Sequence, residues 1–350
     1  MNAFTRSISQ VLQGAANALK TFPAAIVSAA AFAIVTIIRI HLEWPEQESF
    51  NFLFNCLHWS FGLGAIFSMA AITAAYSLYN ERRAFLIANL LSYAVVLITF
   101  LALSMSGAMG IASIFEQSKY AVISDIAAAR VSVAMFVSFM AFIVLAGLPK
   151  EQSDFAKAFF MTHKAFFIAS IYGVVLMGGL SGVAGAVQAL LYHEMSYKVY
   201  SYIATLTGFM SFTIFLGYFP DFRKDQVDER RAVAEKQPRF IEILFGYIMI
   251  PITLALTVVL LLWAGQTIMT NTWPSFLRLS GIATSYAVCG IWLHVMVTHQ
   301  ESALAKFYRR IYPVAALVIL AFEAWALVVQ LNKFGLKMTE YYFALMWVDT

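Results

Sequence analysis

Residues 218–239 read YFPDFRKDQVDERRAVAEKQPR, the one long polar stretch in a chain that is otherwise mostly apolar. Charged side chains are costly inside hydrocarbon, so a stretch of this composition is expected to lie in water. Its six basic residues nearly balance its five acidic ones. We therefore predict that residues 220–239 form a charged, solvated connector, with a short helix that Asp225 caps and on which Arg231 and Glu235 pair at i,i+4.

The composition on either side of this stretch excludes a soluble globular domain. Hydrophobic residues make up 61% of the chain and charged residues 12%, and the mean hydropathy is +0.76. Such values are typical of a protein embedded in a lipid bilayer. The formal charge of +4 does not indicate a nucleic-acid partner, because membrane proteins carry excess Lys and Arg on their cytoplasmic loops.

Apolar runs long enough to cross a bilayer recur along the chain. A hydrocarbon core of roughly 30 Å requires about 20 helical residues. We predict an all-α, polytopic transmembrane helix bundle with nine full spans and a partial tenth that starts near Tyr341. The nine spans are 22–40, 52–79, 85–105, 131–148, 165–192, 199–218, 240–269, 276–298 and 313–331.

The spans divide the chain into four regions. An amphipathic segment (1–21) is expected to lie on the membrane or on the protein itself, and six spans (22–219) precede the charged loop (220–239). The second set of spans occupies 240–350. When loops alternate sides, one side collects most of the 23 Lys and Arg residues, which places the amino terminus and the charged loop in the cytoplasm.

Two polar intervals within the first set are predicted to lie at the membrane surface. Residues 106–130 carry Glu116, Lys119 and Asp125, and we expect a surface helix or a re-entrant turn there. Residues 150–164 are polar on one side and aromatic on the other, which favours an interfacial helix separate from the fifth span.

The chain carries five short motifs, ALKTFP (18–23), FLGYFP (215–220), QPRF (237–240), YIMIP (247–251) and FGL (334–336). Together they resemble a bacterial multi-pass inner-membrane family catalogued as domain of unknown function 4153. Where members typically carry a Tyr-Gly-Leu-Thr turn, this chain has Phe334 and Lys337. The resemblance implies a multi-pass fold in a bacterial inner (plasma) membrane and brings no activity.

The strongest candidate for an intramembrane polar site is Glu323, near the middle of the ninth span. A carboxyl group there is expected to be protonated, paired, or exposed to a wet cavity. It could bind a proton or cation during transport, or be a neutral acid bonded to a neighbouring helix. His294, late in the eighth span, is a candidate partner.

Other polar residues and glycines complete the list of candidates. Arg39 ends the first span, and His58 lies with Asn55 in the second. Three glycines, Gly178, Gly182 and Gly185, put small residues on the fifth span, which permits close packing of helices.

Catalytic, metal and cofactor signatures are weak in this sequence. The motif around Ser181, GLSG, is similar to the nucleophile motif of rhomboid intramembrane proteases, with His294 as base, but the histidine lacks the glycine-rich turn of that family. Cys56 and Cys289 both fall in apolar segments, so we expect neither a disulfide nor a zinc site. We predict no catalytic residues, no metal and no cofactor.

Three classes of function remain open. The first is a transporter or permease of an unknown small solute, built around Glu323 and a broken, glycine-rich fifth span. The second is a non-catalytic scaffold, sensor or subunit of an envelope complex, which would bind a membrane-protein partner. An intramembrane serine protease is the remote third.

Overall fold

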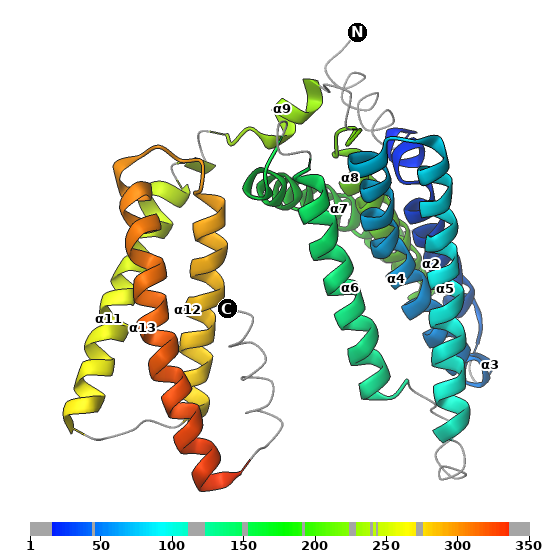
Figure 1. Cartoon of the computed structure of the whole chain (residues 1–350). Coiled ribbons are helices and arrows are strands. Elements are labelled where there is room, and N and C mark those ends of the chain that lie inside the picture. Colours follow the sequence, from blue (N-terminus) through cyan, green and yellow to red (C-terminus); the bar gives the residue numbers. More distant parts are fainter. Residues whose placement is uncertain are drawn as a thin grey trace. The chain divides into compact units, whose positions relative to one another are not determined.

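The computed structural model describes residues 16–43, 46–110, 123–148, 153–190, 193–223, 229–238, 241–242, 244–270 and 276–335. In these residues every regular element is a helix (Figure 1). Eight of the helices are long and apolar enough to cross a membrane. This confirms an all-helical, multi-pass membrane protein. The predicted tenth segment at 341–350 lies outside the described residues.

The chain divides into two compact units, with the boundary between Lys236 and Gln237. This boundary falls inside the predicted charged loop. The first unit contains α2 (Pro23–His41), α3 (Glu46–Ser49), α4 (Asn51–Ala74), η1 (Ala75–Tyr79), α5 (Arg82–Gly110), α6 (Asp125–Ala146), α7 (Phe155–Leu190), α8 (Lys198–Gly217) and α9 (Glu229–Glu235). The second contains η4 (Leu244–Met249), α11 (Ile250–Thr270), α12 (Phe276–Met296) and α13 (Ala303–Phe334).

Helix α4 is the centre of the first unit. It packs against α2, α5 and α6, and α8 packs against α2 on one side and α7 on the other. A glycine allows α4 and α5 to approach closely, because a Cβ built at Gly64 would lie 2.2 Å from the Val96 Cγ2. Asn80 ends the α4–η1 helix with a left-handed backbone (φ 50°).

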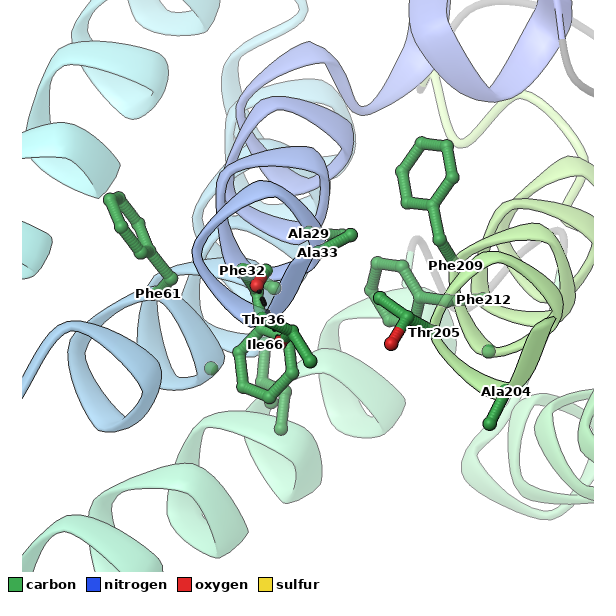
Figure 2. A pocket seen from close by; sticks show the side chains of 13 residues that line it. Ala29, Phe32, Ala33, Thr36, Phe61, Ile66, Ala204, Thr205, Phe209 and Phe212 are labelled. Atoms are coloured by element: carbon green, nitrogen blue, oxygen red, sulfur yellow. Dashed lines mark hydrogen bonds between the residues drawn. The ribbon is translucent and has the colours of Figure 1, made fainter. Parts of the chain in front are cut away.

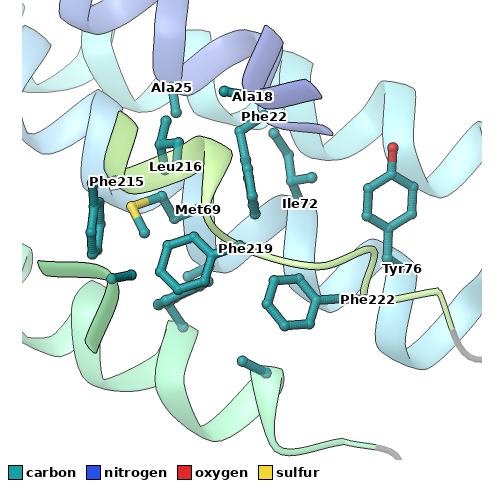
Figure 3. Close-up of a cluster of buried hydrophobic side chains, with 14 of the residues drawn as sticks. Ala18, Phe22, Ala25, Met69, Ile72, Tyr76, Phe215, Leu216, Phe219 and Phe222 are labelled. Atoms are coloured by element: carbon teal, nitrogen blue, oxygen red, sulfur yellow. The ribbon is translucent and has the colours of Figure 1, made fainter. Parts of the chain in front are cut away.

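Aromatic side chains form the core at one end of this unit (Figure 3). Phe22 precedes α2, Phe142 lies near the end of α6, and Phe219 and Phe222 follow α8. The Phe142 and Phe219 rings meet edge to face with centroids 5.0 Å apart, and the Phe22 ring lies 6.4 Å from both. The beginning of the polar stretch is therefore buried and holds three helix ends together.

The amino-terminal segment joins the same core where it is described. Residues 16–21 are helical, and Ala18 is completely buried in the cluster. This part of the segment packs on the protein itself, one of the two placements that the sequence left open.

Helix α7 differs from the prediction because it is continuous. The predicted interfacial helix (150–164) and fifth span (165–192) form one helix from Phe155 to Leu190, which Asp154 caps by accepting a hydrogen bond from the Lys157 N–H (2.9 Å). The prediction of a broken fifth span was therefore wrong: four glycines between 178 and 190 leave the helical backbone intact.

Helix starts also differ from the predicted spans. The interval 106–130 was expected to lie on the surface, but α5 continues to Gly110 and α6 begins at Asp125, where the Ser124 Oγ accepts from the Ala127 N–H (3.3 Å). Likewise α13 begins at Ala303 rather than Pro313, with Ser302 as its cap. Membrane helices tolerate an internal proline such as Pro313 when other groups satisfy the freed carbonyl.

The second unit is a three-helix bundle in which α11 and α12 both pack against α13. Tyr308 and Tyr312 on α13 are buried against α12. A Cβ at Gly290 would lie 2.2 Å from the Tyr312 ring, so the glycine is required where α12 and α13 approach.

Candidate functional site

Glu323 lies inside the second unit. Its side chain is 2% exposed, and Ile319 and Ala326 on the same face of α13 are also buried. The next residue towards the amino terminus, Phe322, meets the Trp263 ring of α11 edge to face at 5.4 Å. The buried Glu323 Oε1 has no hydrogen-bond partner among the described residues. The carboxyl group is thus enclosed in an apolar setting with an unused oxygen.

His294 occupies a different place in the same unit. Its ring centroid lies 6.2 Å from those of Tyr308 and Tyr312, and its buried Nδ1 has no partner among the described residues. Tyr312 precedes Glu323 by eleven residues, or about 16 Å along a helix. The structure therefore places His294 with the tyrosines and does not bring it to Glu323.

The tyrosines around His294 were not predicted from the sequence. The Tyr308 hydroxyl donates to the Gly290 carbonyl (2.9 Å), and the Tyr312 hydroxyl donates to the Ala287 carbonyl (3.0 Å). Tyr286 shares a hydrogen bond with Thr257 on α11 (2.9 Å). These bonds join the three helices of the unit. The spacing of Tyr308 and Tyr312, four residues apart on one helix face, was the available signal.

Arg39 and His58 meet in the first unit, between α2 and α4. The Arg39 guanidinium donates to the Asn55 and Asn51 side-chain oxygens, both at 3.1 Å. The His58 Nε2 lies 2.9 Å from the Thr36 Oγ1. Thr36 donates in turn to the Phe32 carbonyl, so its hydroxyl accepts from His58. The structure therefore places two of the four predicted polar residues where α2 and α4 pack together, in two separate hydrogen-bonded groups.

A long-range ion pair lies at the same end of the first unit. Lys198, the first residue of α8, donates to the Glu43 carboxylate (2.5 Å) and to the His41 carbonyl at the end of α2 (3.1 Å). Residues 155 positions apart carry no sequence signal for such a pair. This contact fixes the start of α8 beside the end of α2.

The fifth-span glycines lie on α7. A Cβ added at Gly178 or Gly182 meets nothing within 4 Å, and one at Gly185 would lie 3.5 Å from the Tyr200 hydroxyl. The described residues of the first unit therefore offer no packing partner to Gly178 and Gly182, and their role in helix packing stays a prediction. Ser181 also lies on α7, which is continuous at this position.

Part of the charged stretch, around Arg231, is docked on the first unit, contrary to the prediction of a solvated connector. Arg231 is 6% exposed: its Nε donates to the Glu235 Oε1 (3.1 Å), as predicted, and its Nη2 donates to the Ala146 carbonyl at the end of α6 (2.7 Å). Glu235 also accepts from the Ser153 hydroxyl (2.6 Å). The physical reason is that unpaired carbonyls at a helix end attract a cation.

A second cation anchors the same short helix. The Lys164 ammonium on α7 donates to the carbonyls of Val233, Ala234 and Lys236 at the end of α9, at 2.9 to 3.3 Å. The same ammonium lies 5.7 Å from the centroid of the Tyr218 ring. Asp225, the predicted cap, lies outside the described residues.

The groups at these sites can exchange protons and form hydrogen bonds. Among the described residues, no group of three or more His, Cys, Asp or Glu side chains could hold a metal ion. Both cysteines, one buried and one exposed, are free. Comparison with known proteins finds no matching family model, no matching curated protein and no matching solved structure.

Proposed function

We propose that this protein is a multi-pass membrane transport protein in which the Glu323 carboxyl group binds a proton or a cation during the transport of a small solute. The proposal includes a bacterial inner membrane, on the strength of the family resemblance, with the amino terminus in the cytoplasm. The observation that carries it is the burial of Glu323 without a partner for its Oε1. An ionised carboxylate in such a setting is strongly disfavoured, so the group is expected to be neutral in this conformation.

Transport requires that the acid become accessible in a second conformation. Neutral and ionised forms of Glu323 would then favour the closed and open arrangements of α11, α12 and α13 respectively. An acid that is neutral in one conformation and ionised in the other couples proton binding to a conformational change.

Carbodiimide labelling tests the state of the acid without knowledge of the solute. Dicyclohexylcarbodiimide is apolar and reacts with a protonated carboxyl group, so we expect mass spectrometry to find the adduct on Glu323. Glu301 is the natural comparison, because its hydrogen bond and ion pair with Lys306 (2.6 Å) lower the pKa of this exposed carboxyl. Labelling of Glu301 in preference to Glu323 would contradict the proposal.

Transport itself is tested by recording currents from proteoliposomes on a solid-supported membrane, with a panel of amino acids, sugars, nucleosides and inorganic ions. We expect at least one solute to give a current that Glu323→Gln abolishes. The matched control Glu301→Gln makes the same chemical change on the surface of the same unit and should keep the current. Equal currents in both variants would refute a role for Glu323.

The second candidate, a non-catalytic membrane component, is favoured by the exposed α7 surface. Gly178 and Gly182 leave an exposed strip of small residues with open space above it. Such strips pack against other membrane helices. This candidate predicts that Gly182→Leu removes a copurifying membrane-protein partner while Glu323→Gln does not.

A further inference from the structure

A cavity of about 340 Å³ lies between α2, α4 and α8 in the first unit (Figure 2). This volume falls within the roughly 300–1,000 Å³ typical of small-molecule sites. Apart from two threonine hydroxyls, its lining is aliphatic and aromatic. Phe32 is 40% exposed and Gly208 is exposed, so the cavity opens onto the outer surface of the bundle, where lipid chains lie.

The cavity follows one face of each of the three helices. On α2 the lining residues are spaced three and four apart from Ala29 to Thr36, which is roughly 10 Å of helix. The lining residues of α4 and α8 are spaced in the same way, from Phe61 to Ile66 and from Ala204 to Phe212. The result is an elongated apolar slot, suited to a hydrocarbon chain.

The same helix faces become polar at one end of the slot. One turn beyond Thr36 lies Arg39, and one turn before Phe61 lies His58, which bonds to the Thr36 hydroxyl. Two turns before Ala204 lies Lys198, which bonds to the end of α2. All three continuations meet at one end, so the slot has an apolar body and a basic, hydrogen-bonding head.

The charges at this end are complementary to a zwitterion. Arg39 donates to two amide oxygens and forms no ion pair with a carboxylate among the described residues, since the Glu43 carboxylate pairs with Lys198. The short helix α3 lies beside Arg39, because the Gln47 amide donates to the Arg39 carbonyl (3.0 Å). That helix supplies Glu46 and Glu48, and the buried Glu48 Oε1 has no described partner.

We propose that this slot binds a membrane phospholipid whose head group carries a phosphate and a primary ammonium. One acyl chain occupies the apolar slot between α2, α4 and α8. The phosphate lies against the Arg39 guanidinium, a geometry that guanidinium groups favour. The ammonium lies towards the α3 carboxylates. The proposal concerns the first unit and does not depend on the role of Glu323.

Glycines supply a matched pair of variants for the test. A Cβ at Gly208, in the slot, meets nothing within 4 Å, and neither does one at Gly182 on α7. Gly208→Leu therefore fills the slot without a backbone clash, and Gly182→Leu makes the same change of helix propensity outside it. Arg39→Gln removes the proposed phosphate contact.

The experiment is native mass spectrometry of the full chain in mild detergent, titrated separately with phosphatidylethanolamine, phosphatidylglycerol and phosphatidylcholine of identical acyl chains. We expect one phosphatidylethanolamine to bind the unmodified protein and Gly182→Leu most tightly. Gly208→Leu should weaken binding at least about tenfold, since lost contact with as few as two methylene groups has this effect. Arg39→Gln should weaken it about fivefold.

Three results would overturn the proposal. Equal binding by Gly208→Leu and Gly182→Leu would show that the slot is not the site. Preference for the anionic phosphatidylglycerol would refute the zwitterionic assignment, and preference for phosphatidylcholine, whose ammonium is quaternary, would refute the primary ammonium. A change in oligomeric state on Gly208→Leu, with lipid binding unaltered, would show that a second copy of the chain occupies the slot.

Discussion

Replacing Arg231 by alanine should release the charged stretch from the first unit. The substitution removes the donor to the Ala146 carbonyl (2.7 Å) and leaves Glu235 without its cation, in a pair whose side chains are only 7% and 10% exposed. Breaking a buried ion pair by removing one partner costs about 3–5 kcal/mol. Glu235 keeps its bond from the Ser153 hydroxyl, so we take the lower end, about 3 kcal/mol.

Chymotrypsin cleavage after Phe222 measures this release. Phe222 is completely buried, and the Arg231 guanidinium lies 5.8 Å from its ring centroid, so cleavage requires local opening of the docked stretch. When opening and closing are fast, the rate follows the population of the open form. A loss of about 3 kcal/mol then corresponds to roughly a hundredfold faster appearance of the two fragments that end and begin at this bond.

Two controls make the result specific to the buried pair. Arg223→Ala removes a cation whose ion pair with Asp221 (3.5 Å) is 40% and 32% exposed, and pairs of that kind contribute only about 0–1 kcal/mol. The double replacement Arg231→Met with Glu235→Leu should restore much of the protection, because apolar residues often substitute for a buried ion pair without loss. Unchanged cleavage of Arg231→Ala would refute the docking argument.

Three further substitutions test the packing, each by thermal unfolding of the purified protein in detergent. Gly290→Ala should destabilise the protein by about 1–3 kcal/mol, since its Cβ would meet the Tyr312 ring. A Cβ at Gly281 on the same helix meets nothing within 4 Å, so Gly281→Ala should not be destabilising for this reason. Equal melting temperatures of the two variants would disprove the close approach of α12 and α13. Phe142→Ala should lower the free energy of unfolding by about 3–5 kcal/mol, because the ring is completely buried. Phe136 is 61% exposed, so Phe136→Ala should have little effect, and similar losses in both variants would contradict the aromatic core. Arg309→Ala should cost about 1–3 kcal/mol, because Arg309 donates to the Val297, Thr298 and Gln300 carbonyls after α12; no loss would argue against this cap.

The sequence was informative about helices and less so about where they begin. Apolar runs identified the membrane helices, because burial in lipid requires length and composition that can be read directly. Ends depend on a single cap: Ser302 starts α13 ten residues before the expected Pro313, and Asp154 starts an unbroken α7. A capping residue is one of many Ser and Asp residues in the sequence, and a hydropathy average over a window of residues does not distinguish it from the others.

Contacts between residues close together in the sequence could be predicted, and contacts between distant residues could not. Arg39 and Asn55 lie on α2 and α4, which only the short α3 separates in the chain, so a polar contact between them could be anticipated. The Lys198–Glu43 pair and the slot above Gly208 require the packing of α8 on α2, which no spacing in the sequence reveals. The docking of Arg231 was missed for the same reason, since the carbonyl that accepts its hydrogen bond belongs to Ala146 at the end of α6.

Glu323 differs from the three cations that bind helix ends in this protein, because those cations are hydrogen-bonded and the Glu323 Oε1 has no described partner. Arg231, Lys164 and Arg309 each donate to carbonyls at the end of a helix, where the backbone leaves acceptors unpaired and the helix dipole favours positive charge. Their charges stabilise the fold, so substituting these residues should change stability before it changes any activity. Glu323 makes no such bond through its Oε1, yet at 2% exposure it is more deeply buried than Arg231 at 6%. An oxygen without a described partner on a buried acid is costly to keep, which is why the proposed proton or cation binding is assigned to Glu323.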